Sequence, residues 1–334
     1  MNKNQILGLL VIVIILAGAG AWYLQSVQQH TLSPAKHITI DPSPTSASAL
    51  LLVAKDQGYF AGHGLNVTFK STPSGSVAMQ DLQDRNIDFV LVNEYSLSEP
   101  VLYNKSLRAI GTLSESNTIY IVARRDRGIV RIQDLEGKKI GVTKGSITEY
   151  FMNRFFVLNG LSSGNVTVTY LPPASIVDAL DSGDIDAAVS FEPYVYQMRQ
   201  KMRENVLVWP ANLGQYAQFS LVCSEITLQE HPEIVEAVLA SVLQAETYVN
   251  SHQEEAKKVT RRLTTFDDQY LDQEWQNHHF SVGLSQSLIT SMEDETRWRV
   301  RRNLTNATDV PDFSKYISPG TLYRLKPSAV TLIR

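Results

Sequence analysis

Residues 139–158 read KIGVTKGSITEYFMNRFFVL, and this stretch decides the fold. The run Lys139 to Val142 predicts a short strand, Thr143-Lys144-Gly145-Ser146 supplies helix-cap chemistry, and a helix is expected from Ile147 to Leu158. Asn159-Gly160 then acts as a helix stop. A strand, a polar turn and a helix in this order are the repeating unit of an α/β protein.

The same order recurs on both sides of this stretch. We expect further strands at 37–40, 65–70, 87–92, 108–113, 118–123, 166–171, 185–190 and 219–223, and helices at 47–55, 79–84 and 175–181. The last third changes character and predicts amphipathic helices at 232–250, 253–263, 268–280 and 285–303. Two consecutive β-α-β series predict two α/β lobes.

The N-terminus carries an uncharged, mostly apolar run from Ile6 to about Leu24. As a helix, at ~1.5 Å per residue, the run would reach about one hydrocarbon core. A signal peptidase could cut at the small-x-small sites 17–19 or 19–21, or the run could remain as an anchor with Trp22 and Tyr23 at the interface. No cysteine directly follows the apolar run, so a lipoprotein anchor is excluded. Both interpretations place the rest of the chain outside the cytoplasm, in the periplasm or at the cell surface.

Composition and single residues exclude several functions. A net charge of -4 gives no basic field for nucleic acid. The single cysteine, Cys223, lies in an apolar stretch and is expected to be a buried structural thiol. His278 and His279 are adjacent on an expected helix and face different directions, so they make a poor metal site. We find no nucleophile and base at a recognisable spacing, and we expect a monomeric binding protein with no cofactor, metal or catalytic residue.

Several segments then match a known family in order and spacing. They are the stretches 54–60, 64–67, 134–142, 143–146, 171–173, 183–188 and 191–194, which begin with AKDQGYF and end with FEPY. This series resembles the nitrate/sulfonate/taurine-type substrate-binding proteins of ABC transporters. The resemblance is specific for fold and weak for ligand.

The resemblance implies the type II periplasmic binding protein fold, with two crossings between lobes at 118–126 and 218–224. Residues 1–29 would then be a signal peptide or membrane anchor. One lobe would comprise 30–124 and 218–334, and the other 125–217. The implied function is to capture nitrate, a sulfonate, taurine or another small metabolite and deliver it to the permease subunits. Two alternatives stay open, a pyrimidine or other heterocyclic thiamine-precursor-like ligand, and an enzyme on the same fold.

The position of a ligand follows from a general rule, because open α/β sheets bind ligands beyond the carboxyl ends of their strands. Turns that follow the expected strands therefore give the candidate ligand-binding residues, which are Thr45, Ser46, Ser74, Gly75, Ser76, Asn93, Glu94, Glu115, Ser116, Thr143, Lys144, Gly145, Ser146, Ser190 and Glu192. Backbone N–H groups at the helix starts could hold an oxyanion.

The three glutamates among these candidates argue against an anionic ligand. If Glu94, Glu115 and Glu192 face the ligand, they favour an amine, an amide or a ring N–H. If they cap helices or point outward, they say nothing of the ligand. The sign of the ligand's charge therefore stays open.

Overall fold

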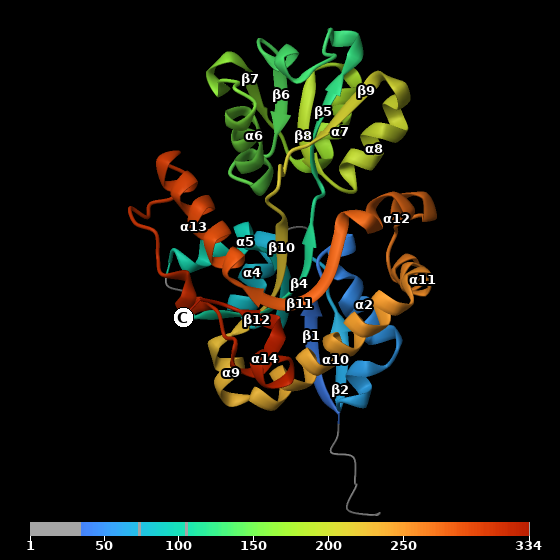
Figure 1. The fold of residues 1–334 in the computed structure, drawn as a ribbon, viewed down its shortest axis with the longest axis vertical. Helices are drawn as coiled ribbons and strands as arrows, with labels where there is room; N and C mark the ends of the chain where they lie inside the picture. Colours follow the sequence, from blue (N-terminus) through green and yellow to red (C-terminus); the bar gives the residue numbers. More distant parts are fainter. Residues whose placement is uncertain (1–34, 73–74, 104–105, 334) are drawn as a thin grey trace, which may run out of the picture. The chain divides into compact units, whose positions relative to one another are not determined.

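The β-α-β series fold into two separate sheets. The computed structural model describes residues 35–72, 75–103 and 106–333. Within them, a seven-stranded sheet has the order β12-β11-β4-β10-β3-β1-β2 and a five-stranded sheet has the order β7-β6-β8-β5-β9 (Figure 1). The strands are β1 (Lys36–Asp41), β2 (Leu65–Phe69), β3 (Phe89–Asn93), β4 (Leu107–Ser116), β5 (Ile119–Arg124), β6 (Lys139–Val142), β7 (Thr167–Tyr170), β8 (Ala187–Phe191), β9 (Val206–Pro210), β10 (Ala217–Ser224), β11 (His278–Ser285) and β12 (Val330–Thr331).

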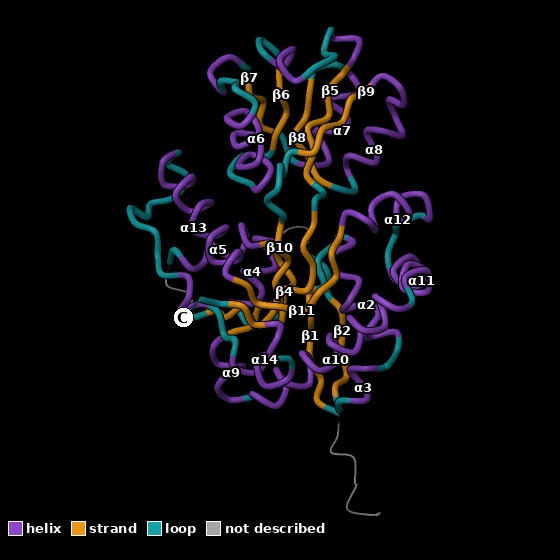
Figure 2. Tube along the Cα trace, viewed as in Figure 1, coloured by secondary structure: helices purple, strands orange, loops and turns teal. Residues whose placement is uncertain are grey.

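Helices flank both sheets (Figure 2). Around the seven-stranded sheet these are α2 (Ala49–Asp56), α3 (Tyr59–Gly62), α4 (Gly75–Gln83), α5 (Glu94–Val101), α9 (Glu225–Glu230), α10 (Pro232–Ser251), α11 (Gln253–Leu263), α12 (Asp268–Glu274), α13 (Gln286–Arg301) and α14 (Gly320–Leu325). Around the five-stranded sheet they are α6 (Ile147–Leu158), α7 (Pro173–Ser182) and α8 (Tyr194–Met202). The interior strand β3 is apolar and buried from Phe89 to Val92, as expected for a strand covered on both faces.

The chain changes sheet twice within the compact unit of residues 37–334. β4 ends at Ser116 in the larger sheet, and β5 begins at Ile119 in the smaller one. β9 ends at Pro210, and the chain re-enters the larger sheet with β10 at Ala217. The changes of sheet therefore lie at residues 117–118 and 211–216, each a little earlier in the chain than the segments expected from the sequence.

Strand directions bring the predicted loops to these changes of sheet. β10 starts at the second change of sheet, and β3 runs antiparallel to it while β1 runs parallel to β3. β5 starts at the first change of sheet, β8 runs antiparallel to it, and β6 runs parallel to β8. The carboxyl ends of β1, β3, β6 and β8 consequently all lie on the edges of the two sheets where the chain passes between them. The turns that follow these strands carry most of the predicted site residues.

Most expected elements lie within a few residues of the observed ones, and one expected helix is wrong at its end. The helix predicted over 268–280 stops as α12 and a short 3-10 turn at Asn277, after which the chain enters β11. Phe280, Val282 and Leu284 are buried alternately there, and β11 pairs antiparallel with β4. The sequence analysis did not predict the strands β9 and β12 or the helices α3, α5, α8, α9 and α14.

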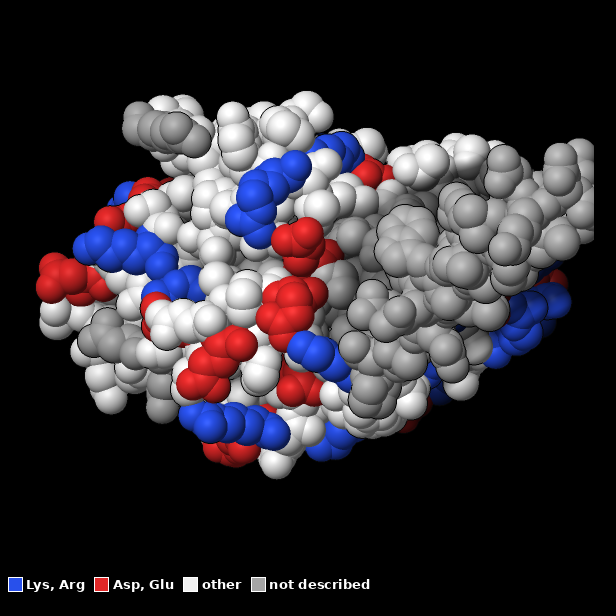
Figure 3. All heavy atoms as spheres, turned by 90° about the horizontal axis from the view of Figure 1, so that it is seen from below, with Lys and Arg blue, Asp and Glu red and all other residues white. Residues whose placement is uncertain are grey.

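The apolar run from Ile6 to Leu24, with its signal or anchor interpretation, lies outside the described residues. Among the helices that the structure does describe, none combines the length and apolar character needed to span a bilayer. On the face drawn in Figure 3, basic and acidic side chains lie side by side. This mixture agrees with the small net charge of -4.

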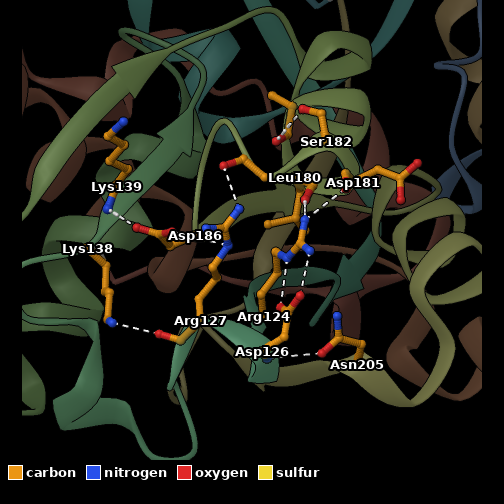
Figure 4. Close-up of polar contacts among 12 residues, drawn as sticks. Arg124, Asp126, Arg127, Lys138, Lys139, Leu180, Asp181, Ser182, Asp186 and Asn205 are labelled. Carbon is orange, nitrogen blue, oxygen red and sulfur yellow. Dashed lines mark hydrogen bonds and ion pairs between the residues drawn. The ribbon is translucent and has the colours of Figure 1, made fainter.

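A polar network ties together the end of β5 that lies away from the change of sheet (Figure 4). Arg124 binds Asp126 through two hydrogen bonds of 2.9 and 2.7 Å and also donates to the Leu180 carbonyl at 2.6 Å. The Arg124 guanidinium holds the pKa of Asp126 well below its usual range. Nearby, the Lys139 N–H donates to Asp186 at 2.9 Å. The charges of this network are matched within the five-stranded sheet and its helices, so we assign it a structural role.

Candidate ligand-binding site

The turn between β6 and α6 is held by its own hydrogen bonds. Gly145 has φ +63°, a conformation that favours glycine, and its N–H donates to the Glu149 carboxylate at 2.6 Å. Ser146 caps α6, and its hydroxyl donates to the Thr143 carbonyl at 2.7 Å. The Thr143 hydroxyl donates to the Leu171 carbonyl at 3.0 Å. The two hydroxyls thus shape the turn.

Lys144 is the exposed member of this turn. Its ammonium lies 5.6 Å from the centre of the Tyr170 ring, on the strand next to β6. A cation–π contact at an exposed site is weak, on the order of 1 kcal/mol or less. The Lys144 side chain can therefore leave the ring at small cost.

A hydrogen bond joins this turn to the larger sheet. The Tyr95 hydroxyl, on α5, donates to the Gly145 carbonyl at 3.0 Å. Asn93 positions α5 by accepting a 2.8 Å hydrogen bond from the Ser96 N–H at the N-cap. Alongside, the rings of Tyr150 on α6 and Trp298 on α13 meet edge to face, with centroids 5.7 Å apart. The predicted residue Gly145 is thus joined to Tyr95 of α5, the helix that the predicted residue Asn93 caps.

A second cluster brings Ser46 and Glu192 together. The buried Ser46 hydroxyl donates to the Tyr270 hydroxyl at 3.2 Å, and the rings of Tyr270 and Tyr196 lie 5.4 Å apart. The Tyr196 N–H in turn donates to Glu192 at 2.9 Å. Ser190, two residues before Glu192 on β8, is buried, and its hydroxyl oxygen has no hydrogen-bond partner among the described residues.

Glu192 also pairs with a second acid, Glu274 of α12. Both side chains are at most 2% exposed. Burial first, and the Glu274 charge second, raise the pKa of Glu192 to about 8. Burial also raises the pKa of Glu274, while Asn277, which donates to it at 3.0 Å, and Arg199, 3.8 Å away, favour its charged form. Two neighbouring buried carboxyls cannot both ionise cheaply, so Glu192, with its pKa raised to about 8, holds its proton at neutral pH.

Glu94 forms the other buried acid pair, with Glu295 of α13. Glu94 accepts a 2.6 Å hydrogen bond from the Gln218 N–H at the start of β10. Burial raises the pKa of Glu94 to about 7, and burial together with the Glu94 charge raises the pKa of Glu295. Arg299 partly offsets both effects for Glu295, and its guanidinium lies 3.6 Å from the centre of the Tyr95 ring. This pair lies within the larger sheet and its helices.

The remaining predicted residues lie around these clusters. Ser116 is buried and shares a 3.1 Å hydrogen bond with Thr118. Glu115 is half-buried and lines a cavity of about 370 Å³ beside the second change of sheet. Thr45 precedes the short 3-10 turn that contains Ser46, and its hydroxyl shares a 3.4 Å hydrogen bond with Ser43.

The turn before α4 is only partly described. Ser74 lies outside the described residues, and Ser76 is exposed on the first turn of α4. At Gly75 an added Cβ would come within 2.7 Å of the Ser96 hydroxyl, so a glycine is required by the close approach of α4 to α5.

Sequence reasoning missed the side chains that the C-terminal helices bring to the site. Glu274 and Tyr270 of α12, together with Tyr120 of β5, are buried around Glu192. Asn277 donates to the Tyr120 hydroxyl at 3.1 Å, across the two sheets. Burial raises the pKa of both tyrosines. No local pattern marks these residues, because they meet Glu192 only through the fold.

The cysteine is buried, and the two adjacent histidines lie on a strand. Cys223 is fully buried, as predicted, and burial raises the pKa of its thiol to about 12. His278 lies on β11, where burial lowers its pKa to about 3, and His279 is the next residue along the strand. In the described ranges no three His, Cys, Asp or Glu side chains are grouped so that they could hold a metal ion.

Two sheets joined by two changes of sheet, with polar turns at the joining edges, define the type II periplasmic binding protein fold. Solved structures share it. The periplasmic aliphatic sulphonate binding protein SsuA from Escherichia coli superposes with a TM-score of 0.72 at 17% identity, over 85% of this chain and 98% of that chain. The desulfurization enzyme DSZB superposes with a TM-score of 0.67 at 15% identity, over 87% of this chain and 100% of its own. The fold therefore accommodates both binding proteins and an enzyme.

The sequence places the chain more narrowly. Residues 45–256 match the family described as NMT1/THI5 like, and the chain belongs to this family. A Bacillus subtilis protein named for aliphatic sulfonates binding is 24% identical over 93% of this chain and 94% of its own length. The taurine-binding periplasmic protein of Escherichia coli is 24% identical over 60% of this chain and 63% of its own length.

Proposed function

We propose that this protein is the solute-binding component of an ABC importer that works outside the cytoplasm. It captures a small polar metabolite, of the class to which sulfonates and taurine belong, between the turns at the joining edges of its two sheets. It then presents the captured molecule to the permease subunits. The family, the shared fold and the relatives named for sulfonate and taurine binding support this function.

One observation carries the proposal, namely the contacts between the two sheets through predicted site residues. Tyr95 donates to the Gly145 carbonyl across the sheets. Tyr196, whose N–H donates to Glu192, also donates through its hydroxyl to Asp267, just before α12, at 3.1 Å. A ligand that adds contacts to both sides stabilises the closed arrangement, which a permease can then distinguish from the open one.

We propose that the moving lobes divide at residues 117–118 and 211–216. The pairing of β5 with β8 and β9 supports this division, because it assigns residues 119–124 to the smaller lobe rather than to the larger one. Few chain segments then have to bend on closure, since only these two short stretches connect the lobes.

Binding is favoured over catalysis by the chemistry of the site. Nucleophilic catalysis needs an activated nucleophile beside a base. The thiol of Cys223 is fully buried in β10, with a pKa raised to about 12. The carboxyls and hydroxyls of the site are suited to hydrogen bonding a solute.

The β6–α6 turn tests the proposal. A double variant, Lys144→Ala with Ser146→Gly, removes the Lys144 ammonium and the hydroxyl that caps α6. A Ser-to-Gly change at an N-cap costs only a few tenths of a kcal/mol in stability. We expect the affinity for sulfonates and taurine, screened by calorimetry, to fall at least tenfold for any solute that binds the wild type. Ser224→Gly is the matched control, because Ser224 caps α9 in the same way and contacts Thr227 instead of the site. Equal affinity in the double variant and the control would refute the role of the turn.

A further inference from the structure

The two lobes meet along one edge through α8 of the smaller lobe and α12 of the larger one (Figure 1). The Tyr196 hydroxyl, on α8, donates to Asp267, just before α12, at 3.1 Å. Asn277, just after α12, donates to the hydroxyl of Tyr120 on β5 at 3.1 Å. We call this contact, between Tyr120 and α8 on one side and residues 267–277 on the other, the α8–α12 interface. Separating the lobes breaks it.

Two carboxyls from opposite lobes are buried in the α8–α12 interface. Glu192 follows β8 in the smaller lobe and is 2% exposed, and Glu274 of α12 in the larger lobe is 1% exposed. The guanidinium of Arg199, on α8, lies 3.8 Å from the Glu274 carboxylate, and the Glu274 charge acts on Glu192. Because the two carboxyls belong to different lobes, opening moves them apart and admits water to both.

The closed arrangement supports a charge on Glu274 better than a charge on Glu192. Glu274 accepts a 3.0 Å hydrogen bond from Asn277 and faces Arg199. Only one oxygen of Glu192 is bound, since Oε2 accepts the Tyr196 N–H at 2.9 Å while Oε1 is buried with no partner among the described residues. A buried charge with so little support favours the protonated acid. Water takes over this support once the lobes open, and the pKa of Glu192 then returns toward its ordinary value of 4.5.

The other ionisable groups around the pair keep their charge state at neutral and mildly alkaline pH. They are Arg199 and Tyr196 of α8, Tyr120 of β5, Tyr270 of α12 and Asp267 before it. The pKa of each of the three tyrosines is raised above 10, so they stay neutral, and the arginine stays charged. His278, next to Asn277, is neutral because burial lowers its pKa to about 3. Glu192 is thus the group at this interface that titrates near pH 8.

The second buried acid pair does not divide between the lobes. Glu94 lies on α5 and Glu295 on α13, and both helices belong to the larger lobe, so lobe opening leaves this pair together. At the opposite edge, Arg302 after α13 donates to Asn153 of α6 at 3.1 Å, and this contact involves no carboxyl. We therefore assign the response to pH to the α8–α12 interface.

We propose that the α8–α12 interface is a pH-sensitive switch, in which closure of the lobes takes up one proton at Glu192 and loss of that proton favours the open arrangement. The inference rests on the proposed function for the movement of the lobes, and it adds the condition under which they close. A solute that binds the closed arrangement is accordingly held more tightly at lower pH.

The direction and size of the effect follow from proton linkage. The pKa of Glu192 is about 8 in the closed arrangement, so between pH 4.5 and about pH 8 this arrangement binds more protons than the open one. The ratio of closed to open chains falls as pH rises through this window. A single group with these pKa values lowers the ratio about tenfold between pH 7 and pH 9.

Spin labels on the two helices measure this ratio without any solute. Gln197→Cys on α8 and Gln273→Cys on α12 place the labels at exposed positions, and the native thiol of Cys223 is buried. Electron–electron double resonance of the full-length protein in a non-ionic detergent then gives a short distance for closed chains and a long one for open chains. We expect the ratio of short to long distances to be about tenfold lower at pH 9 than at pH 7. An unchanged ratio would overturn the proposal.

Two further variants of the labelled protein assign the effect to its residue. Glu192→Gln is neutral at every pH and should keep the short distance at both pH 7 and pH 9. Asp267→Asn is the matched control, because it removes an exposed carboxylate of the same interface while asparagine still caps α12. It should show the same fall in the ratio as the protein without it. Wild-type pH dependence in Glu192→Gln, or its loss in Asp267→Asn, would overturn the proposal.

Addition of taurine or ethanesulfonate to the same labelled protein separates the switch from the proposed function. If the distances ignore pH but shorten with either solute, the switch is wrong and the proposed function stands. If the distances follow pH in the manner that depends on Glu192 and neither solute changes them, the switch is supported and capture of this class of solute is contradicted.

Discussion

Replacing Glu192 by glutamine should make the protein more stable at neutral pH. Glu192 is 2% exposed, and burial together with the nearby Glu274 charge raises its pKa in the folded protein to about 8, against an ordinary value of 4.5. A glutamine at this position is neutral at every pH, as the protonated form of Glu192 is. The substitution therefore removes the need to take up a proton on folding.

The sign and size of the change in the free energy of unfolding follow from proton linkage. Between pH 4.5 and about pH 8 the folded state binds more protons at Glu192 than the unfolded state, so the stability of the wild type falls as pH rises through this window. At pH 7 the medium is about 2.5 pH units above the ordinary pKa, and each unit is worth about 1.4 kcal/mol. Glu192→Gln should thus raise the free energy of unfolding by about 3 kcal/mol at pH 7, and by less than about 1 kcal/mol at pH 5.

Urea unfolding of the full-length protein, followed by tryptophan fluorescence at pH 5 and pH 7, measures this difference. Glu230→Gln, at an exposed position on α9, is the control and should leave the free energy of unfolding unchanged at both pH values. A gain of the same size at both pH values, or a loss of stability at pH 7, would show that Glu192 does not hold a proton in the folded protein at neutral pH.

Three further outcomes are expected. Tyr95→Phe removes the hydrogen bond to Gly145 across the sheets, so ligand affinity measured by calorimetry should fall several-fold while the free energy of unfolding changes by less than about 1 kcal/mol; unchanged affinity would argue against closure through this contact. Arg299→Lys loses the hydrogen bonds to Ser98 and the Tyr95 carbonyl, so urea unfolding should show a loss of about 2–4 kcal/mol, and a loss below about 1 kcal/mol would contradict the buried geometry. Cys223 should resist an aromatic disulfide reagent in the native protein and react after unfolding, and rapid native reaction would show that the thiol is not buried.

Local sequence patterns predicted most of the strands and helices. The strand Lys139–Val142 and the helix Ile147–Leu158 lie where the residues predicted them, because apolar spacing and cap residues act locally. The strand β11 was not predicted, because the alternating burial of Phe280, Val282 and Leu284 follows directly on a helical pattern. Its pairing with β4 also joins segments that are far apart in the chain. A strand that gains its stability from a distant partner leaves only a weak local signal.

The site residues also divide into those that local patterns predicted and those that only the fold brings together. Glu94 and Glu192 were found because each follows a strand, and the rule for open sheets selects such positions. Their partners Glu295 and Glu274 come from helices 201 and 82 positions further along the chain, and no spacing in the sequence relates them. The roles of the two glutamates as halves of buried acid pairs could therefore be seen only in the folded chain.

Native mass spectrometry of the freshly purified protein tests most directly whether the two sheets enclose a solute. The wild type should carry one small molecule per chain, which is released on denaturation, and the variant with Lys144→Ala and Ser146→Gly should carry much less of it. A wild type that is empty after expression in its own host, or a variant that retains the same molecule in the same amount, would contradict capture between the turns of the two sheets.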